Sequence, residues 1–461
     1  MELTRTVCDR ARLARDARFD GRFFIGVKTT RIYCRPICPA PSPKEKNILY
    51  FPSAAAAAEA GFRPCLRCRP ETSPGTPAWL GTSASVSRGL KLIAGGALDE
   101  TGVDKLAERL GVGARHLRRM FLEHLGATPV AIAQTRRVHF AKKLIDETDL
   151  SMTQVAMASG FGSIRRFNAT FQNLYGRSPR ELRAVRARVS QQAGVYTFRL
   201  SYRPPYNWAS IIGFLMPRAI PGVEQISPEE YRRTISLDGH AGTIAVRHVP
   251  ESHHLELRIE FPEPTLLFRI VERVRDIFDL RADPAEVDGH LSREPVLKQS
   301  VRRHAGIRVP GCWDGFEIAV RAILGQQVSV KAATTMAGRL VAEFGAKFGD
   351  AGLFPRAEAL VDADLARIGL TRQRAHSIRE LASAVARGDV SFDASHGLEQ
   401  LESTLTELPG IGPWTAQYVA MRIGEPDAFP SGDLYLKKFA NSSDAWRPWR
   451  AYAAMYIWSM S

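Results

Sequence analysis

Four of the six cysteines lie within 35 residues of one another, and this clustering constrains the fold more than any other feature of the sequence does. They form two pairs, Cys34 with Cys38 and Cys65 with Cys68, and 26 residues separate the pairs. Such pairs are typical of a tetrahedral zinc site with four cysteine ligands, in which all four thiols bind as thiolates. A disulfide framework and four unrelated thiols are the alternatives, and the clustering favours metal in a reducing compartment.

The charge of the chain is unevenly distributed. Residues 1–193 hold 32 Lys and Arg against 16 Asp and Glu, whereas the remaining residues hold 31 against 32. The excess in the first part is expected if that part binds the phosphates of double-stranded DNA. A membrane surface would also attract it, but no amphipathic anchor, signal segment or run of 18 apolar residues accompanies the charge. We therefore expect a cytoplasmic protein of several domains that binds DNA and no membrane.

A Ser/Thr/Pro/Gly linker at 72–77 precedes a stretch that repeats itself. Gly111-Val112-Gly113 recurs 49 residues later as Gly160-Phe161-Gly162, and further matches follow at an interval of 50 residues. Each copy has an apolar helix, at 103–110 or 152–159, then a glycine turn and a second helix that carries arginines. The repeat predicts two helix-turn-helix units joined by a helix over 129–147.

The second helix of each unit would lie in the major groove of DNA. The candidate DNA-reading residues are Arg115, Arg119, Arg165, Arg166 and Asn168. A helical bundle whose arginines only meet solvent is the alternative. A basic linker helix is expected to follow, carrying Arg183, Arg186 and Arg188.

Hydrophobic periodicity predicts the remaining elements. In the cysteine-containing part, it predicts strand, turn and strand over 19–31 with Asp20-Gly21 at the bend, and a short helix over 53–60 capped by Ser53. From residue 194, alternation predicts antiparallel strands with a helix laid against them. These strands are expected at 195–200, 232–237, 242–247 and 254–259, and the helix at 208–216. Helices are then expected at 266–278, 316–324, 331–344, 360–368, 373–387 and 398–407.

The sequence Leu408-Pro409-Gly410-Ile411-Gly412 followed by Pro413-Trp414-Thr415-Ala416 predicts a tight hairpin between two helices. We expect glycine at 410 and 412 because the turn needs unusual backbone angles and because a ligand must approach the backbone closely. The second helix directs its unpaired N–H groups at a phosphate. The pattern resembles the helix-hairpin-helix of base-excision DNA glycosylases, in which a catalytic carboxylate follows the second helix. Asp433 stands at that place, although such hairpins also occur in proteins that only bind DNA.

The stretches Cys34-Arg35-Pro36 and Gly61-Phe62-Arg63-Pro64-Cys65 resemble the N-terminal domain of the bacterial adaptive response regulatory protein. The resemblance implies that Cys34, besides binding zinc, accepts a methyl group from a DNA methyl phosphotriester. Zinc keeps the thiol ionised, and the thiolate is the nucleophile. A purely structural zinc site is the alternative. The doubled helix-turn-helix, with Gly176-Arg177-Ser178-Pro179, is similar to AraC-type transcription regulators, so a promoter operator and RNA polymerase are candidate partners.

Residues 194–461 resemble bacterial 3-methyladenine DNA glycosylase II. The supporting stretches include Ala322 to Val330, Pro409 to Tyr418 and Ala445 to Arg450. By this resemblance Asp433 is the catalytic carboxylate, and Gln327 is the side chain that wedges into the duplex. The base pocket is assigned to Phe214, Trp414, Tyr418 and Trp458.

An electron-rich aromatic pocket attracts a cationic alkylated purine that has been flipped from the stack. Trp414 stands where lyase-competent relatives carry a lysine, so the resemblance implies a monofunctional enzyme. Core packing is the alternative reading of each aromatic residue alone.

Two departures from these families matter. Only seven residues separate Lys438 from Trp446, where the glycosylases usually place another helix, and this could disturb the packing that presents Trp458. No Pro-Cys-His-Arg segment of an O6-alkylguanine transferase occurs, and Cys8 and Cys312 are read as ordinary thiols.

The sequence therefore predicts a multidomain α+β protein with four parts. These are a zinc-binding methyl-acceptor domain with four cysteine ligands (1–77), an all-α double helix-turn-helix domain (83–189), a small antiparallel β domain (194–284) and an all-α helix-hairpin-helix glycosylase domain (285–461). We expect hydrolytic excision of N-alkylated purines coupled to methyl-phosphotriester sensing and transcription regulation. The alternative is a methylation-activated regulator with an impaired glycosylase half.

Overall fold

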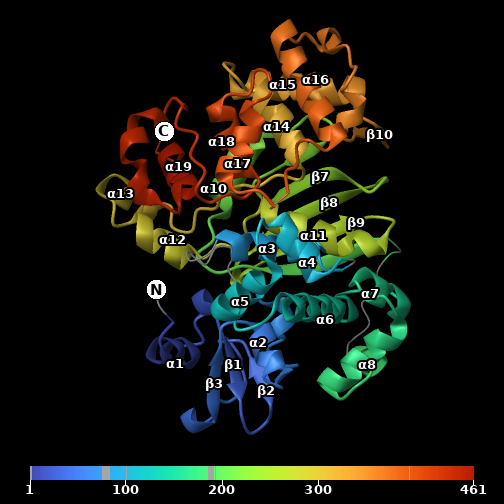
Figure 1. Ribbon diagram of the computed structural model, residues 1–461, viewed down its shortest axis with the longest axis vertical. Coiled ribbons are helices and arrows are strands. Elements are labelled where there is room, and N and C mark those ends of the chain that lie inside the picture. The colour runs from blue at the N-terminus through green and yellow to red at the C-terminus, as the bar shows by residue number, and fades with distance from the viewer. Residues whose placement is uncertain are drawn as a thin grey trace.

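The computed structural model describes residues 3–74, 84–99, 101–184, 192, 194–393 and 395–460. The helix-turn-helix part and the five-stranded sheet lie in its middle (Figure 1). The cysteine-containing sheet lies at one end and the helices of the C-terminal part lie at the other. The predicted multidomain α+β fold is confirmed. Arg186, Arg188 and the end of the linker at 75–77 lie outside the described residues, and the four domain boundaries remain predictions.

The N-terminal part is a four-stranded sheet of order β3-β1-β2-β4 with two helices. Its elements are α1 (Arg5–Leu13), β1 (Phe24–Val27), β2 (Ile32–Cys34), β3 (Ile48–Phe51), α2 (Ala54–Glu59) and β4 (Arg63–Pro64). Ser53 caps α2, as predicted, by accepting a hydrogen bond from Ala56 N. The bend predicted at Asp20-Gly21 is present, because Arg22 N donates to Phe19 O at 3.0 Å and Gly21 has φ of 75°. The strand predicted before this bend is wrong, because residues Ala17–Phe19 form a 3-10 helix. Asp20 pairs with the buried guanidinium of Arg35.

The double helix-turn-helix is confirmed in seven helices. They are α3 (Ala84–Ala94), α4 (Val103–Arg109), α5 (Ala114–Leu125), α6 (Pro129–Glu147), α7 (Met152–Ala158), α8 (Ile164–Tyr175) and α9 (Pro179–Ala184). The repeated glycines end the two second helices, because Gly126 and Gly176 adopt left-handed angles with φ of 64° and 66°. Phe121 and Phe171, which also recur, are fully buried against the helices before them.

The third part is a five-stranded antiparallel sheet of order β5-β9-β8-β7-β6. The strands are β5 (Val195–Ser201), β6 (Glu224–Ile226), β7 (Glu230–Leu237), β8 (His240–Val249) and β9 (His254–Glu260). The helices α10 (Trp208–Leu215) and α11 (Leu267–Ile277) belong with it. The sequence predicted four of the five strands and missed β6, which has only three residues.

The C-terminal part is helical. It contains α12 (Pro284–Leu291), α13 (Pro295–Arg303), α14 (Gly315–Leu324), α15 (Val330–Phe344), α16 (Arg372–Arg387), α17 (Leu398–Thr406), α18 (Pro413–Arg422) and α19 (Arg450–Trp458), with the short strands β10 (Lys347–Phe348) and β11 (Ala351–Gly352). The helix predicted at 360–368 is wrong. Only the 3-10 turn Leu365–Ile368 forms there, because Asp364 caps Ala366 N and starts a new turn.

Other 3-10 helices connect these elements. They are η1 (Ala17–Phe19), η2 (Glu45–Asn47), η3 (Pro70–Thr72), η4 (Met216–Arg218), η5 (Pro250–Ser252), η6 (Pro264–Leu266), η7 (Ala357–Ala359) and η9 (Leu436–Trp446). Among the described residues, no helix is both long and apolar enough to cross a membrane.

Helix α6 lies across the middle of the molecule and contacts both halves (Figure 1). On one side, His139 Nε2 is 2.9 Å from the hydroxyl of Tyr33, the residue before Cys34. Burial lowers the pKa of His139 to about 4, so the ring is neutral near pH 7. On the other side, the Phe140 ring packs against Phe198 of β5 at 6.4 Å and edge-on to Phe268 of α11 at 4.7 Å. The helix-turn-helix part and the β domain thus share one hydrophobic core.

We expect Phe140→Ala to lower the free energy of unfolding by about 3 kcal/mol, because truncating a buried ring leaves a cavity. Val130→Ala on the same helix is the control, since Val130 is exposed and its loss should change stability by less than about 0.5 kcal/mol. Urea unfolding followed by far-UV circular dichroism measures both. Equal effects of the two substitutions would contradict the shared core.

Candidate functional site

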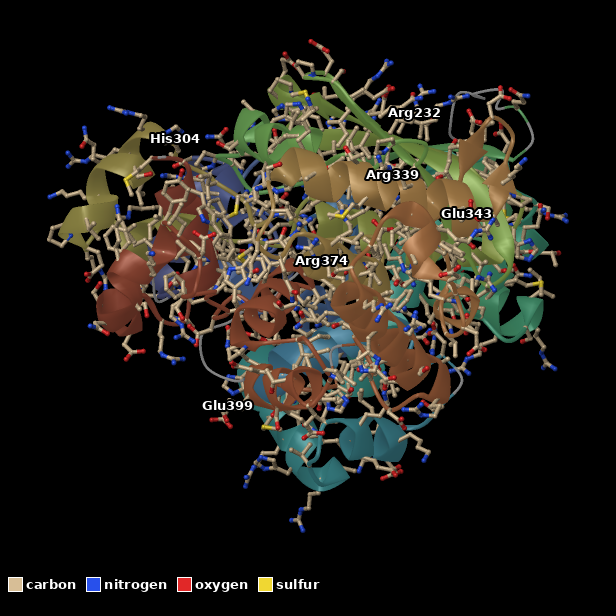
Figure 2. All side chains as sticks on the ribbon, turned by 90° about the horizontal axis from the view of Figure 1, so that it is seen from above. Arg232, His304, Arg339, Glu343, Arg374 and Glu399 are labelled. Carbon is tan, nitrogen blue, oxygen red and sulfur yellow. The ribbon has the colours of Figure 1, made fainter. Side chains whose placement is uncertain are left out.

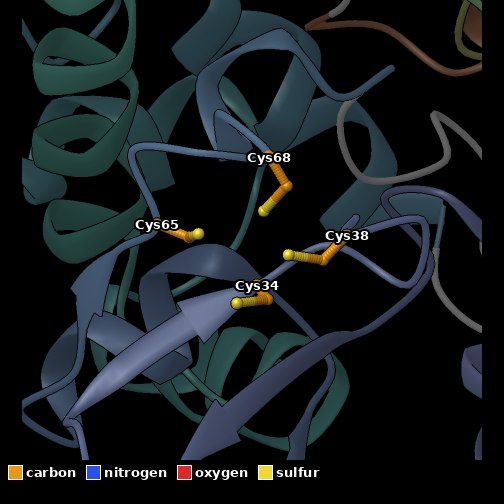
Figure 3. Close-up of side chains that lie close together, drawn as sticks. All are labelled: Cys34, Cys38, Cys65 and Cys68. Atoms are coloured by element: carbon orange, nitrogen blue, oxygen red, sulfur yellow. The ribbon is translucent and has the colours of Figure 1, made fainter. Parts of the chain in front are cut away.

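The four predicted zinc ligands meet in space. The Sγ atoms of Cys34, Cys38, Cys65 and Cys68 all lie within 4.8 Å of one another (Figure 3). Zn–S bonds of about 2.3 Å would place the four sulfurs of a tetrahedral site about 3.8 Å apart, so the cluster fits zinc with small adjustments. Cys34 ends β2, and Cys65 follows β4, the strand paired in parallel with β2. Strand pairing therefore brings the two cysteine pairs together.

Arg35 holds the metal site in place from within the protein. Its buried guanidinium pairs with Asp20 and donates to Cys68 O at 3.1 Å and to Thr72 Oγ1 at 2.6 Å. The backbone N–H of Arg35 donates to Cys68 Sγ at 3.3 Å.

The crowded sulfurs shift one another's pKa values in opposite directions. Hydrogen bonding to Cys34 lowers the pKa of Cys65 and raises the pKa of Cys68. A divalent cation removes this conflict, because it allows all four thiols to ionise together.

The predicted DNA-reading side chains lie on the second helices of the two units. Arg115 and Arg119 are exposed on α5, and Arg165, Arg166 and Asn168 are exposed on α8. Their side chains form no ion pair with any described residue, and only that of Arg119 has a hydrogen-bond partner, His116 Nδ1 at 3.0 Å. The four arginines and the Asn168 amide are therefore available to phosphates or bases.

The two hairpin glycines have different structural roles. Gly410 has φ of +76°, and a Cβ there would lie 2.1 Å from Ser377 Oγ, so glycine is required. Gly412 has φ of −93°, and a Cβ there would meet nothing within 4 Å. The expectation that both positions need unusual angles is wrong for Gly412. Gly412 is the N-cap of α18 and provides no side-chain cap, so the N–H groups of Trp414 and Thr415 have no hydrogen-bond partner among the described residues.

The loop between α14 and α15 is tied to the hairpin. Gln327 is exposed there with a left-handed φ of 55°, an unusual conformation for a residue with a Cβ. Its neighbour Gln326 donates from Nε2 to Gly410 O at 2.9 Å and to Thr415 Oγ1 at 3.0 Å. The guanidinium of Arg374, labelled in Figure 2, donates to Gln326 O. No sequence pattern indicated that Gln326 would join the loop to the hairpin.

The five residues assigned to the base pocket and to catalysis lie around one cavity of about 610 Å³. The Phe214 and Trp458 rings stack with centroids 6.0 Å apart, and those of Trp414 and Tyr418 stack at 5.6 Å. Phe214 belongs to α10 of the β domain, whereas the other aromatic residues belong to α18 and α19. The cavity therefore opens between two parts of the chain.

The carboxylate of Asp433 lines this cavity and is held by one of its oxygens. Oδ1 accepts from the backbone N–H groups of Tyr435 at 2.9 Å and Leu436 at 3.3 Å, and from Trp458 Nε1 at 3.1 Å. Among the described residues, nothing donates to Oδ2. The segment shortened relative to the glycosylase family is the 3-10 helix η9, which begins beside Asp433. The carboxylate therefore stays bonded to Trp458 despite the shortening.

Arginines accompany the aromatic rings of the cavity, and the sequence analysis missed them. The Arg218 guanidinium lies 4.0 Å from the centre of the Phe214 ring. Arg422 lies 5.2 Å from the same ring and donates to the Tyr418 hydroxyl at 2.9 Å. Burial raises the pKa of Tyr418, but Arg422, Arg218 and Arg321 outweigh it, and the net pKa is below that of an ordinary tyrosine. Each of the first two arginines follows its aromatic partner by four residues, a helical spacing that could have revealed them.

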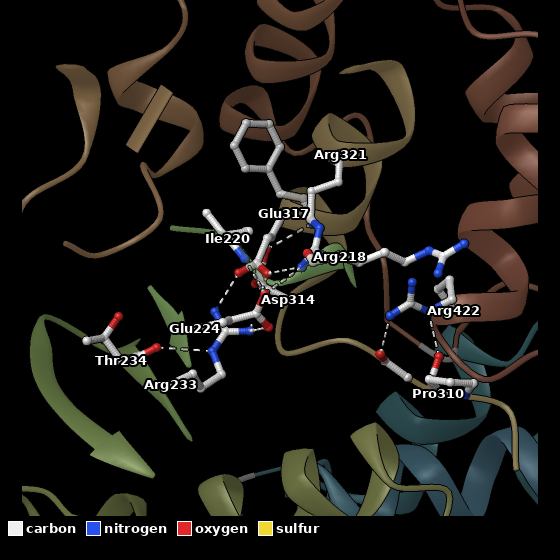
Figure 4. A network of polar contacts seen from close by, with 12 residues as sticks. Arg218, Ile220, Glu224, Arg233, Thr234, Pro310, Asp314, Glu317, Arg321 and Arg422 are labelled. Atoms are coloured by element: carbon white, nitrogen blue, oxygen red, sulfur yellow. Dashed lines mark hydrogen bonds and ion pairs between the residues drawn. The ribbon is translucent and has the colours of Figure 1, made fainter. Parts of the chain in front are cut away.

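Arg321 lines the cavity from a buried charge cluster (Figure 4). It lies 3.3 Å from both Glu224 and Glu317, and Arg233 pairs with Glu317 at 2.7 Å. The cluster joins strands β6 and β7 to helix α14, and its two cations balance its two anions. A second bond, from Arg321 to Arg218 O at 2.5 Å, connects the cluster to the cavity wall.

Four family descriptions match the chain in succession. They are "Metal binding domain of Ada" at 7–71, "Helix-turn-helix domain" at 106–184, "AlkA N-terminal domain" at 197–314 and "HhH-GPD superfamily base excision DNA repair protein" at 320–456. The match to the metal-binding domain agrees with a zinc centre at the cysteine cluster.

The chain is 38% identical over 475 residues to the "Probable bifunctional transcriptional activator/DNA repair enzyme AlkA" of Mycobacterium tuberculosis, covering 98% of this chain and 95% of that protein. It is 31% identical over 277 residues to "DNA-3-methyladenine glycosylase 2" of Escherichia coli, covering 57% of this chain and 96% of that protein. It is 34% identical over 151 residues to the "Bifunctional transcriptional activator/DNA repair enzyme Ada" of Escherichia coli, covering 32% of this chain and 40% of that protein.

We expect Gly410→Ala to lower the free energy of unfolding by about 2 kcal/mol or more, because the new Cβ is strained at positive φ and collides with Ser377. Gly412→Ala is the matched control, with a change within about 0.5 kcal/mol, because the position has an ordinary φ and open space. Urea unfolding followed by tryptophan fluorescence compares them. A loss at Gly412 as large as that at Gly410 would refute the assignment.

Proposed function

The chain belongs to the family of bifunctional transcriptional activator/DNA repair enzymes, and we propose that Asp433 carries its repair reaction and Cys34 its damage sensing. The protein binds zinc and DNA, and it combines a DNA-3-methyladenine glycosylase with a transcription activator. The observation that carries the catalytic proposal is the fixation of the Asp433 carboxylate at the wall of an aromatic cavity.

The glycosylase reaction follows from this arrangement. An N-alkylated purine flipped into the cavity is cationic and meets the rings of Trp414 and Trp458. Breaking the bond between the sugar and the base sends the electron pair to the purine, which departs neutral, and positive charge develops on the deoxyribose. The Asp433 oxygen Oδ2 stabilises that charge and orients water, which adds a hydroxyl to the sugar carbon and releases a proton. Because Trp414 is not a nucleophile, the enzyme is monofunctional.

The arginines interact with some of the aromatic rings of the cavity and not with others. Arg218 and Arg422 lie over Phe214 and beside Tyr418, so these rings already interact with protein cations. Trp414, by contrast, receives no cation–π contact from a described residue. The cationic part of the base is therefore drawn towards Trp414 and towards the Asp433 carboxylate that Trp458 bonds.

In the complex with DNA, the Gln327 side chain fills the space in the duplex that the flipped base has left. The hairpin at Gly410 and Gly412 binds a phosphate of the DNA backbone. The uncapped N–H groups at the start of α18 support the phosphate site, and the exposure and left-handed backbone of Gln327 support its entry into the duplex. Because the side chain of Gln326 bonds Gly410 O in the hairpin, its neighbour Gln327 stays at a fixed distance from the proposed phosphate site.

Cys34 is the methyl acceptor of the zinc site. Its thiolate attacks the methyl carbon of a DNA methyl phosphotriester, an S–C bond forms, the C–O bond breaks, and the phosphate leaves as an ordinary charged diester. Bound zinc keeps the four thiols ionised. Among the described residues, the backbone N–H of Arg35 donates to the sulfur of Cys68 at 3.3 Å.

No described backbone N–H donates to Cys34. A thiolate without such a donor keeps more of its electron density on sulfur, so Cys34 is a stronger nucleophile than Cys68. Transfer of the methyl group removes one negative charge from the centre, which strengthens binding to unmodified DNA.

The helix-turn-helix units read a promoter operator through Arg115 and Arg119 in one groove and Arg165, Arg166 and Asn168 in the next. Once bound there, the protein would present its surface to RNA polymerase. The alternative of a regulator with an impaired glycosylase half was motivated by the short segment after Lys438. That segment leaves Trp458 bonded to Asp433 and the cavity open, so no observation favours the alternative.

We expect Asp433→Asn to slow release of 3-methyladenine from methylated DNA at least about 100-fold, because the neutral amide does not stabilise the cationic sugar. Glu399→Gln on exposed α17 is the control and should leave the rate unchanged. Single-turnover release of radiolabelled base measures the rate. Release by Asp433→Asn at the wild-type rate would remove Asp433 from the mechanism.

Wild-type protein incubated with DNA carrying methyl phosphotriesters should gain one methyl group on Cys34, because the family resemblance assigns the acceptor to the first cysteine of the four and its sulfur, unlike that of Cys68, accepts no backbone hydrogen bond from the described residues. Tandem mass spectrometry of the peptide that contains both Cys34 and Cys38 locates the methyl group without any substitution. Unmethylated DNA is the control. Modification of Cys38, which is the more exposed of the two, would reassign the acceptor.

A further inference from the structure

Six charged side chains form a network between the zinc centre, helix α6 and the glycosylase sheet. Its cations are Arg69, Lys142 and Lys143, and its anions are Glu71, Asp146 and Glu147. The two lysine side chains and Glu71 are at most 7% exposed. With three charges of each sign, the network is neutral, so the loss of one member leaves a partly buried charge without compensation.

Arg69 connects the network to the metal centre. It follows the ligand Cys68 directly, and its backbone has a left-handed φ of 52°, which is costly for a residue with a Cβ. This conformation is maintained by the fold around the cysteines. The side chain reaches Asp146 at 2.8 Å, Glu71 at 3.2 Å and Glu147 at 3.5 Å. The position of Arg69 therefore depends on the geometry at Cys68.

Lys143 and Glu147 connect the network to the glycosylase. They pair at 2.9 Å, and together they bond the backbone of Arg199 in β5. Lys143 Nζ donates to Arg199 O at 2.6 Å, and Glu147 Oε2 accepts from Arg199 N at 3.3 Å. Strand β5 is an edge of its sheet, so its outer N–H and C=O groups have no neighbouring strand among the described residues. The ion pair on α6 takes the place of that strand.

We propose that this network couples the zinc centre to the glycosylase sheet, so that the state of the metal site controls the stability of strand β5. When the metal holds Cys68, Arg69 neutralises Asp146 and Glu147, and Glu147 stays bonded to Lys143 and Arg199. When the metal site opens, Arg69 relaxes from its left-handed conformation, and the carboxylates attract Lys143 away from β5. The regulatory half then changes the stability of strand β5 in the repair half, although the two halves bind no common ligand.

Hydrogen exchange of full-length protein tests the coupling. Removing zinc with a chelator should raise amide exchange in the β5 peptide about tenfold and leave the opposite edge strand, β6, unchanged. Arg69→Ala should produce the same increase while zinc stays bound, as measured by metal analysis. Glu147→Gln, which lies far along the sequence from the ligands, is a second variant with the same expected effect. Arg67→Ala is the matched control, because this exposed arginine between the ligands forms no ion pair with a described residue.

The decisive comparison is chelation of Arg69→Ala. If the network carries the coupling, zinc removal adds little to the exchange of β5 in this variant, because the connection is already broken. An equal increase on zinc removal in wild type and variant would overturn the proposal. So would unchanged exchange of β5 in zinc-free wild type, or equal increases in β5 and β6, which would indicate general loosening.

Discussion

Two almost fully buried lysines, Lys142 and Lys143, hold α6 between the N-terminal part and the β domain, and the rest of the molecule depends on this position of α6. Buried ammonium groups are costly unless each is paired, and each of these two pairs with an acidic residue four positions later on α6. Their partners come from the N-terminal part, from α6 itself and from the backbone of β5. Polar pairing therefore fixes the orientation of α6, while the neighbouring Phe140 contributes the apolar contact to the shared core.

The base cavity shows a second balance of charge. A cavity that is proposed to bind a cationic base would be expected to avoid arginines, yet Arg218 and Arg321 line it and Arg422 lies behind the Phe214 and Tyr418 rings. Glu224 and Glu317 neutralise Arg321, and the carbonyl groups of Pro310 and Gly311 accept from Arg422 (Figure 4). The Arg218 guanidinium lies over the Phe214 ring, and the Asp433 carboxylate lines the same cavity. In the proposed complex, a cationic base would be attracted by this carboxylate and repelled by the arginines.

The sequence was informative where chemistry requires particular residues at fixed spacing. The cysteine pairs, the glycine-terminated helices of the repeat and the hairpin before Asp433 follow from local rules, and the structure contains each of them. The roles of the site residues were predicted from family resemblance, and these roles remain proposals. Short elements such as β6 were missed because three residues carry no measurable periodicity.

Contacts between distant segments had no signal in the sequence. Gln326 meets the hairpin 84 residues later, and Arg321 meets Glu224 97 residues earlier, so neither pairing could be inferred from local pattern. The same holds for the bonds that Lys143 and Glu147 of α6 form with Arg199 of β5. Such pairings depend on how the helices and strands pack against one another, and this packing is determined by shape and charge over the whole domain.

Strand β5 has a consequence for the evolution of separate repair enzymes. In this chain Lys143 and Glu147 of α6 bond the strand at Arg199, so the regulatory half occupies part of that edge. A gene that encoded only the second half would produce a sheet whose open edge can pair with another copy, which leads to aggregation. Separating the two activities would thus expose this edge, and Arg199, the exposed charge already on β5, would have to be supplemented by a proline or by further charges.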